Sequence, residues 1–443
     1  PAPREEVRRT QRAVASGEYN FETRAGSFTV DGTINTLEDT KLASLFDKTT
    51  LGGAASVSAE IALSGDTAVV RGDLDATQSA IDFDWWFSKA AGIGAKAAFE
   101  AKCVQGTSIE LALTGVDLAS TALSATLSAI PSNDRKSGWR LTHVTAESQH
   151  IDPTGLGMCL QVPYRITGKP GTAGHFEWIA DEAESGHSSH TLSARFEELV
   201  LDPEVPDETS RGVCRDIDLA ATFEDGVERR RHVDIRASEL SVPPFGNNWI
   251  LPLRPDDAPP DGSWTYDVAV QKLDAAPWIA TDFSATAFVT PRSSGFERFE
   301  GDVEGGTISG RYESVKEENS YTFEGKWNNV PARYLLQHLH YPDVLSGRMT
   351  GTAKYSLDRD NPGTLQGEGS FDINNGQFSA DFLYSVLEGK MENELASLPP
   401  SLRFQRFHAD VRMNGDRIET PNLDLTAEGI KLHGGGYFIR EGD

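Results

Sequence analysis

Residues 404–418 read FQRFHADVRMNGDRI, and this stretch decides the class of fold. From Phe407 to Met413 apolar residues alternate with polar ones, and Asn414 and Gly415 follow. Side chains of a β-strand point alternately to the two faces of a sheet, and Asn-Gly accepts the positive φ of a tight hairpin turn. The stretch therefore predicts two antiparallel strands with one apolar face, the second of which continues through Leu423 and Leu425.

The same alternation recurs along almost the whole chain of 443 residues. Further runs lie at 28–34, 57–63, 70–85, 109–127, 139–144, 192–196, 219–235, 266–270, 283–289 and 299–310. Helical periodicity is rare by comparison. We predict an all-β protein: an elongated, twisted, antiparallel β-groove with a few short helices.

Prolines and glycines that end helices or interrupt strands predict how the chain is divided. Residues 1–17 read as an N-terminal helix that starts near Pro3 and stops at Gly17, and residues 18–242 as β-groove repeats. Six prolines between 243 and 262 predict a joint, since proline cannot donate to a ladder. Residues 263–443 form a second β region, with helices expected at 331–340 and 379–398 because apolar residues there recur at helical spacing.

Composition excludes several classes of function. The formal charge of −26 would repel phosphate backbones, so nucleic acid is not expected as a partner. No run approaches the roughly 18 to 20 apolar residues of a membrane-spanning helix, and no signal sequence opens the chain. Because the chain begins without Met, we expect an excised soluble piece of a longer protein.

The three cysteines, Cys103, Cys159 and Cys214, are far apart and odd in number. This spacing argues against a disulfide framework and against a Cys-rich zinc site. A single bridge stays open, and Cys159 with Cys214 is the pairing expected if the chain is periplasmic.

The last 180 residues carry an ordered set of segments. These are a glycine-rich strand (301–310), a helix (327–336), a Leu-x-Gly-x-x-x-Gly strand (345–351), a strand with a glycine turn (367–376) and a final meander (404–436). The set resembles the C-terminal part of AsmA-like proteins. Upstream, Gly72 to Ile81 followed by Lys89 and Gly92 looks like the intermembrane repeats of the related TamB and YhdP types.

The resemblance implies a function as well as a fold. Such proteins are anchored in the inner membrane of Gram-negative bacteria and build a half-open β-groove across the periplasm, which passes phospholipid acyl chains to the outer membrane. It implies a periplasmic location, an inner-membrane anchor in a segment absent here, and contact with both membranes through missing segments. It implies no catalytic residue and no cofactor. The pair Trp85-Trp86 and the glycines at 92–94 fit no family pattern.

The sequence gives weaker evidence for metal-binding or catalytic sites. His187 and His190 beside Asp181 lack the helical spacing of a metal site, and an acidic solvated loop is the better interpretation. Asp82 and Asp84 lie on the solvent face of a strand, not in the apolar pocket that acid and base catalysis needs. His338 and His340 are interpreted as surface residues, and Gly434 to Gly436 as a bulge or a strand break. We therefore predict no enzyme and no metal.

We expect the inward side chains of the alternating strands to line the lipid path. They are Ile61, Leu63, Phe83, Leu111, Leu113, Val303, Ile308, Phe371, Ile373, Val411, Met413, Leu423, Leu425, Ile430 and Leu432. A charge at Leu425 should then block function more than folding, because an open face lets an arginine reach water.

The alternative is a pair of tandem β-sandwiches that bind an envelope protein or a glycan. In that reading Trp249, Trp264 and Trp278 would serve as contact platforms.

Overall fold

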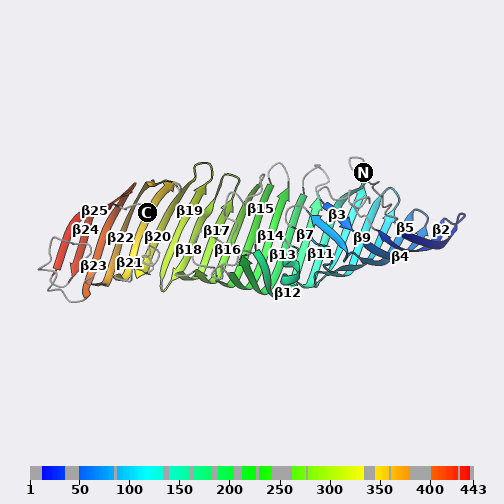
Figure 1. Ribbon diagram of the computed structural model, residues 1–443, viewed down its shortest axis with the longest axis horizontal. Coiled ribbons are helices and arrows are strands. Elements are labelled where there is room, and N and C mark those ends of the chain that lie inside the picture. Colours follow the sequence, from blue (N-terminus) through cyan, green and yellow to red (C-terminus); the bar gives the residue numbers. More distant parts are fainter. Residues whose placement is uncertain are drawn as a thin grey trace, which may run out of the picture. The chain divides into compact units, whose positions relative to one another are not determined.

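The computed structural model describes residues 12–34, 49–83, 87–132, 139–159, 164–180, 188–203, 212–225, 229–241, 262–275, 278–333, 345–358, 361–379, 401–427 and 430–439. The chain divides into two compact units, unit 1 (residues 1–230) and unit 2 (residues 231–443). Figure 1 labels the strands of both units. Almost every described residue lies in a strand. The predicted all-β, twisted antiparallel fold class is therefore confirmed.

Unit 1 is an antiparallel meander in which each strand pairs with the next. Its main sheet contains β1 (Arg12–Asn20), β2 (Ala25–Ile34), β4 (Ala55–Ser64), β5 (Thr67–Asp75), β8 (Ala95–Val104), β9 (Ser108–Leu118), β10 (Thr121–Pro131), β11 (Trp139–His150), β12 (Tyr164–Ala180), β13 (Ser188–Pro203) and β14 (Gly212–Asp225). Because every pairing is sequential, the sheet remains open instead of closing on its first strand.

A small second sheet branches from unit 1. It contains β3 (Thr49–Gly53), β6 (Ser79–Phe83) and β7 (Phe87–Lys89), and the short helix α1 (Pro153–Gly157) lies nearby, where the amide of Ser88 donates to the Cys159 carbonyl. Lys89 is fully buried there, and its Nζ donates to the carbonyls of Ser79 (2.6 Å) and Ala76 (3.1 Å). These hydrogen bonds offset the desolvation cost of burying the Lys89 ammonium.

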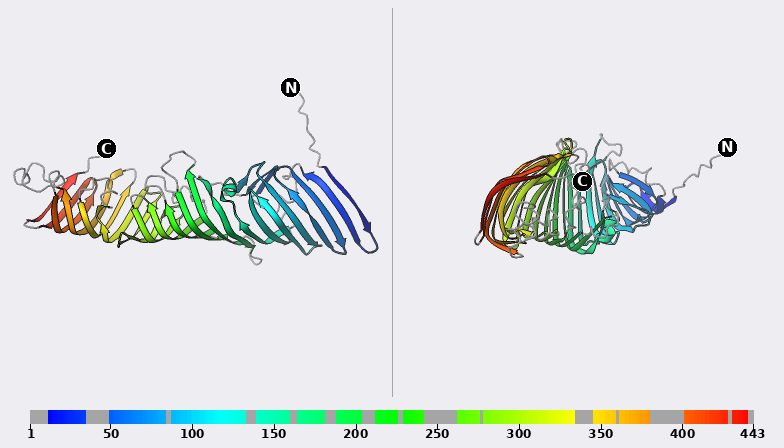
Figure 2. Two further views of the ribbon diagram at one scale, coloured as in Figure 1. Left: turned by 90° about the horizontal axis from the view of Figure 1, so that it is seen from below. Right: turned by 60° about the vertical axis from the view of Figure 1, so that its left-hand side comes forward.

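Unit 2 repeats the meander with longer strands. β15 (Arg229–Ser241) contains the boundary between the units. It is followed by β16 (Gly262–Ala275), β17 (Trp278–Val289), β18 (Ser293–Val303), β19 (Gly306–Val315), β20 (Ser320–Pro331), β21 (Leu345–Asp358), β22 (Asn361–Ser379), β23 (Ser401–Asn414), β24 (Arg417–Ala427) and β25 (Ile430–Ile439). From β16 to β25 each strand pairs with the next, and Figure 2 shows that the strands drawn from yellow to red are bowed.

Several local predictions need correction. The helix expected at 1–17 is wrong from residue 12 onward, since Arg12 to Asn20 pair residue by residue with Ala25 to Thr33 of β2. Gly17 does not stop a helix: a Cβ there would clash with the carbonyl of Ser27 and with the backbone of Phe28 on the neighbouring strand. Close approach between strands, not helix termination, explains this glycine.

The predicted joint at 243–262 lies outside the described residues except for Gly262, which begins β16. The boundary between the compact units falls between residues 230 and 231, upstream of the prolines, and the joint at 243–262 stays a prediction. Of the expected helix at 331–340, Pro331 ends β20, and residues 334–340 are not described. Of the one at 379–398, Ser379 ends β22 and the rest is not described.

The hairpin that opened the sequence argument is confirmed. β23 and β24 pair from Asn414 with Arg417 outward, and Gly415 has a φ of 61°. Positive φ is therefore confined to the glycine, at the first central position of a two-residue turn.

Candidate functional site: the apolar faces of the two units

Strand register defines an apolar face on unit 1. Residues directly opposite each other in antiparallel strands point to the same face, so the pairings can be followed from strand to strand. One row across the sheet is Val30, Ala59, Gly72, Phe99, Leu113, Ala125, Ala146, Phe176, Leu192 and Ala221. A second row is Phe28, Ile61, Val70, Ala101, Leu111, Leu127 and Val144. No charged residue interrupts either row.

The opposite face of unit 1 is polar. Arg71 on β5 contacts Glu100 on β8 at 2.6 Å, and the hydroxyls of Thr126 and Thr145 lie 2.6 Å apart on β10 and β11. These groups are exposed, so screening by water keeps the contribution of each pair to stability small. Their role is to keep this face in water and so to fix the orientation of every strand.

Much of the apolar face of unit 1 remains accessible. Ile61, Leu63, Leu111 and Leu113 are only half-buried, and Leu192 is 36% exposed. The fully buried members are mostly small, such as Ala59 and Ala129. In the described part of unit 1, the small β3–β6–β7 sheet and α1 are the only elements outside the main sheet.

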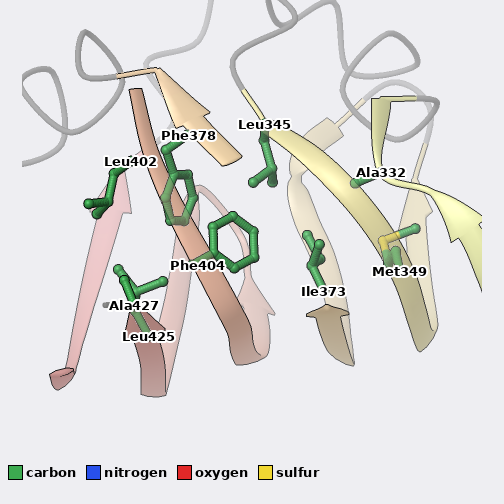
Figure 3. Packing of buried hydrophobic residues seen from close by; sticks show 9 residues of the cluster. All are labelled: Ala332, Leu345, Met349, Ile373, Phe378, Leu402, Phe404, Leu425 and Ala427. Carbon is green, nitrogen blue, oxygen red and sulfur yellow. The ribbon is translucent and has the colours of Figure 1, made fainter. Parts of the chain in front are cut away.

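Unit 2 has an equivalent apolar face that is far better packed. One row is Gly301, Ile308, Trp327, Gly351, Phe371, Ala409 and Leu423, and another is Val330, Met349, Ile373, Phe407, Leu425 and Leu432. A cluster of buried side chains lies at one margin of this face (Figure 3): Ala332, Leu345, Met349, Ile373, Phe378, Leu402, Phe404, Leu425 and Ala427. Val303 and Val330 continue the buried margin toward β16.

On the apolar face of unit 2, aromatic rings lie above glycines of the same strand or of the adjacent strand. A Cβ on Gly325 would come within 2.6 Å of the Phe323 ring, and one on Gly310 within 2.7 Å of the Phe299 ring. Gly376 leaves room in the same way for Phe404, whose ring centroid is 4.5 Å from that of Phe378. Rings that cover glycines supply the packing that the missing side chains would have given, and they help to fix the register of the strands.

A tyrosine cluster lies toward the opposite margin of the unit 2 apolar face. Tyr312, Tyr321 and Tyr355 come from β19, β20 and β21, and ring centroids of neighbours are 6.0 Å and 6.2 Å apart. Burial first, and the neighbouring phenols second, raise the pKa of Tyr355 to about 12. Ser314, opposite Tyr321, is also buried on this face.

The register places thirteen of the fifteen expected lipid-path residues on an apolar face. They are Ile61, Leu63, Leu111 and Leu113 on unit 1, and Val303, Ile308, Phe371, Ile373, Val411, Met413, Leu423, Leu425 and Leu432 on unit 2. Ile430 lies opposite Ala427, and Phe83 belongs to β6 of the small sheet, away from the main ladder. The side chains of Ile430 and Phe83 lie outside the description.

The thirteen differ greatly in accessibility. Val303 and Ile373 are 0% exposed and Leu425 is 2% exposed, whereas Leu432 is 37% exposed. The expectation that a charge at Leu425 would be tolerated by the fold is at odds with this packing, because Leu425 belongs to the buried cluster of Figure 3. Sequence reasoning also missed Trp327 and the three tyrosines. Tyr321, Phe323 and Trp327 share one face of β20, and their alternation with polar residues was the available signal for Tyr321 and Trp327.

The remaining candidate residues are the aspartates and histidines outside the alternating rows. No group of three or more His, Cys, Asp or Glu side chains there could hold a metal ion. Asp82 accepts a hydrogen bond from the Ser88 hydroxyl. The His190 ring packs edge-on against Phe176 and Phe223, while Asp84, Asp181, His187, His338 and His340 are outside the described residues.

The cysteines are all free thiols, so the bridge between Cys159 and Cys214 is not formed. Burial raises the pKa of Cys214 to about 12. The tandem-sandwich alternative also finds no support in the architecture, because the apolar faces belong to open meanders and not to paired sheets. Trp264 stacks on Tyr266 at 5.9 Å, and neither Trp249 nor the side chain of Trp278 is described.

Comparison with known proteins identifies no relative. No family model matches the chain, and no match was found among curated proteins or solved structures. Among the described residues no helix has the length and apolar character to cross a membrane.

Proposed function

We propose that this protein binds phospholipid acyl chains on its apolar faces and passes them along its sheets, as a non-enzymatic lipid conduit of the bacterial envelope. The observation that carries the proposal is the pair of uninterrupted apolar rows on unit 1, whose larger side chains, such as Ile61 and Leu111, remain half-exposed. A contiguous apolar surface of this kind is costly in water and marks an interaction site.

The dimensions of the face suit an acyl chain. Half of a bilayer core, about 15 Å, is the thickness that one acyl chain spans in a membrane. Same-face residues on a strand are roughly 6.6 Å apart and strands about 4.8 Å apart, so a chain covers three residues along a strand or four neighbouring strands. β4 offers five inward residues from Ala55 to Leu63, enough width for a chain in either orientation.

Acyl chains bound on this face would also contribute the hydrophobic free energy that its exposed side chains do not gain in water. Each methylene removed from water contributes about 0.8 kcal/mol, so a chain lying on the rows gains several kcal/mol without any directional contact. Lack of directional contacts is what a conduit needs, because neighbouring positions then have similar energies. The acidic polar face keeps the sheet soluble and leaves head groups in water.

The resemblance to AsmA-like proteins supports the same proposal and adds its setting. We place the protein in the periplasm, with an inner-membrane anchor and an outer-membrane contact supplied by segments outside this chain.

A paired photo-crosslinking experiment tests the proposal in cells. A photoreactive amino acid at Ile61 should label phospholipid, while the same residue at Glu60, its neighbour on the polar face, should not. Leu423 with Asp424 forms the matching pair on unit 2. Equal labelling at both members of each pair would reject the conduit.

The same experiment can also support the alternative function. If Ile61 labels a protein or a glycan and never a lipid, the apolar face is an interaction surface and the alternative class of function is correct. Mass analysis of the adduct distinguishes these outcomes directly.

A further inference from the structure

The polar face of unit 2 carries one row of charges that is balanced within itself. The row has one residue from each of the strands β19 to β24: Arg311, Glu324, Lys354, Glu368, Arg412 and Glu419. The sign of the charge alternates from strand to strand, and the Arg311 guanidinium lies 2.7 Å from the Glu324 carboxylate. Opposite charges on paired positions stabilise a sheet, so this row needs no external partner.

A second row on the same face, nearer the margin where β23 begins, carries cations only. It consists of Arg348, Asn374, Arg406, Thr426 and Lys431, from the strands β21 to β25. Beyond this row, toward the start of β23, Arg403 lies opposite Gln377 of β22. In this described part of the sheet neither set of paired positions contains a carboxylate. We call Arg348, Arg403, Arg406 and Lys431 the basic margin.

Three cations of the basic margin have no anionic partner. Arg348 donates to the carbonyl of Glu304 at 2.8 Å and to the side-chain oxygen of Asn329 at 3.4 Å, both of which are uncharged acceptors. Arg403 and Lys431 are exposed, and among the described residues neither forms an ion pair. These side chains can therefore meet an external anion without first leaving a carboxylate.

The nearest carboxylates of the same face are already engaged. Asp372 accepts from Arg406 at 2.7 Å and lies 3.2 Å from the His408 ring, and Asp424 pairs with His433. The rest of the acidic surface acts over a short range, because salt screens exposed charges beyond about 8 to 10 Å. The net charge of −26 is thus compatible with an anion-binding surface at this margin.

We infer that the basic margin binds the anionic head groups of a membrane surface and holds unit 2 against the bilayer with which it exchanges lipid. Neighbouring cations of the row are two strands apart, about 9.6 Å, so the row from Arg348 to Lys431 spans about 19 Å. An array of this length suits an extended surface of phosphates better than one small anion. Guanidinium groups also match phosphate oxygens in bidentate pairs. The choice of a bilayer over an acidic protein rests on the proposed function.

Vesicle binding by the full chain tests the basic margin. The wild type should sediment with phosphatidylcholine vesicles that contain phosphatidylglycerol, and not with vesicles of phosphatidylcholine alone. The double variant Arg403→Gln with Lys431→Gln should bind the anionic vesicles roughly twentyfold more weakly, about fivefold for each cation removed.

Two control variants separate position from charge. Arg311→Gln with Lys354→Gln gives the same net charge but removes cations of the balanced row, so it should bind as the wild type does. Arg403→Lys with Lys431→Arg keeps both charges and should keep the binding. Absence of binding by the wild type, equal binding to both kinds of vesicle, or equal losses in the two Gln variants would each overturn the inference.

A second measurement applies if the Arg403→Gln, Lys431→Gln variant melts at a lower temperature than the wild type. A photoreactive amino acid at Gln405, which is exposed on β23 between Arg403 and Arg406, should label phosphatidylglycerol in the anionic vesicles. The same residue at Gln366, exposed on β22 near the other end of the strands, should not. Equal labelling at both positions, or labelling in cells of a protein in place of lipid at Gln405, would reject the membrane surface as the partner.

The conduit and the basic margin can fail separately. Lipid labelling at Ile61 in cells without binding to anionic vesicles would reject the basic margin and leave the conduit standing. Vesicle binding that depends on Arg403 and Lys431, without lipid labelling at Ile61, would reject the conduit and leave a membrane-docking surface.

Discussion

The apolar face of unit 1 and that of unit 2 follow the same alternation of residues but differ in how they are filled. Unit 1 carries small residues such as Ala59 and Ala97 between half-exposed larger ones, whereas unit 2 carries aromatic rings over glycines and buries Ile373 completely. Alternation therefore fixes which side chains share a face, while side-chain size decides whether the face packs on itself or stays available.

The difference assigns different roles to the two units. In unit 2 the buried margin around Phe378 and Phe404 acts as a hydrophobic core and holds the bowed strands together. In unit 1 the accessible rows are the stronger candidate for transient contact with acyl chains. A charge on each face should separate the two units directly, while pH and added methyl groups test the packing of unit 2 and thiol reactivity tests the packing of unit 1.

The largest effect is expected from a charge on each face. Ile373→Arg buries an unpaired guanidinium in the Figure 3 cluster and should cost about 3 to 5 kcal/mol in the free energy of unfolding. Ile61→Arg, half-buried on unit 1, should cost about 1 kcal/mol, because the long side chain reaches water, yet it should abolish lipid labelling. Urea unfolding measured by circular dichroism compares the two, and equal destabilisation would mean that unit 1 is packed as tightly as unit 2.

Alkaline pH should weaken unit 2 through its tyrosines. Burial raises the pKa of Tyr266 and of Tyr355 to about 12 in the folded protein, against about 10 when unfolded. Each phenol thus contributes stability that is complete below about pH 10 and is lost as the pH rises toward 12, by at most about 2.7 kcal/mol. Urea midpoints at about pH 9 and pH 11.5 should differ less in Tyr355→Phe than in the wild type, and an unchanged difference would contradict this origin.

An added methyl group tests the rings that lie over glycines. Gly376→Ala places a Cβ against the Phe404 ring and the Ser346 carbonyl, so it should cost about 1 to 3 kcal/mol. Gly434→Ala, on β25 of the same unit, meets no atom within 4 Å and should be neutral within a few tenths of a kcal/mol. Thermal unfolding of both variants gives the answer, and two equal melting temperatures would show that the aromatic packing tolerates rearrangement.

Thiol reactivity is the mildest probe, since it leaves stability unchanged. Cys159 is 1% exposed and the pKa of Cys214 is raised to about 12, so both should react slowly with a disulfide reagent in the folded protein. In denaturant without reductant all three cysteines should react. Recovery of a single thiol under those conditions would establish a disulfide in the purified protein and contradict the free state.

Much of the fold followed from alternation alone. The register places thirteen of the expected inward residues, on β4, β9, β18, β19 and β22 to β25, on common faces because period-2 strands in an antiparallel ladder keep each residue on its side. The hairpin turn at Gly415 was also predictable from the residue types there. The weakest inference was the N-terminal helix, where the ladder formed with β2 overrides local preference.

The sequence by itself determined that the chain is all-β, that its strands are antiparallel and that each sheet has one apolar and one polar face, because these depend only on side-chain period and turn residues. Only the tertiary structure decided that Leu425 is buried while Leu432 is exposed, that Lys89 lies inside a small second sheet and that three tyrosines from separate strands meet. Burial and convergence depend on the curvature of the sheet and on neighbours distant in sequence, which alternation along one strand does not encode.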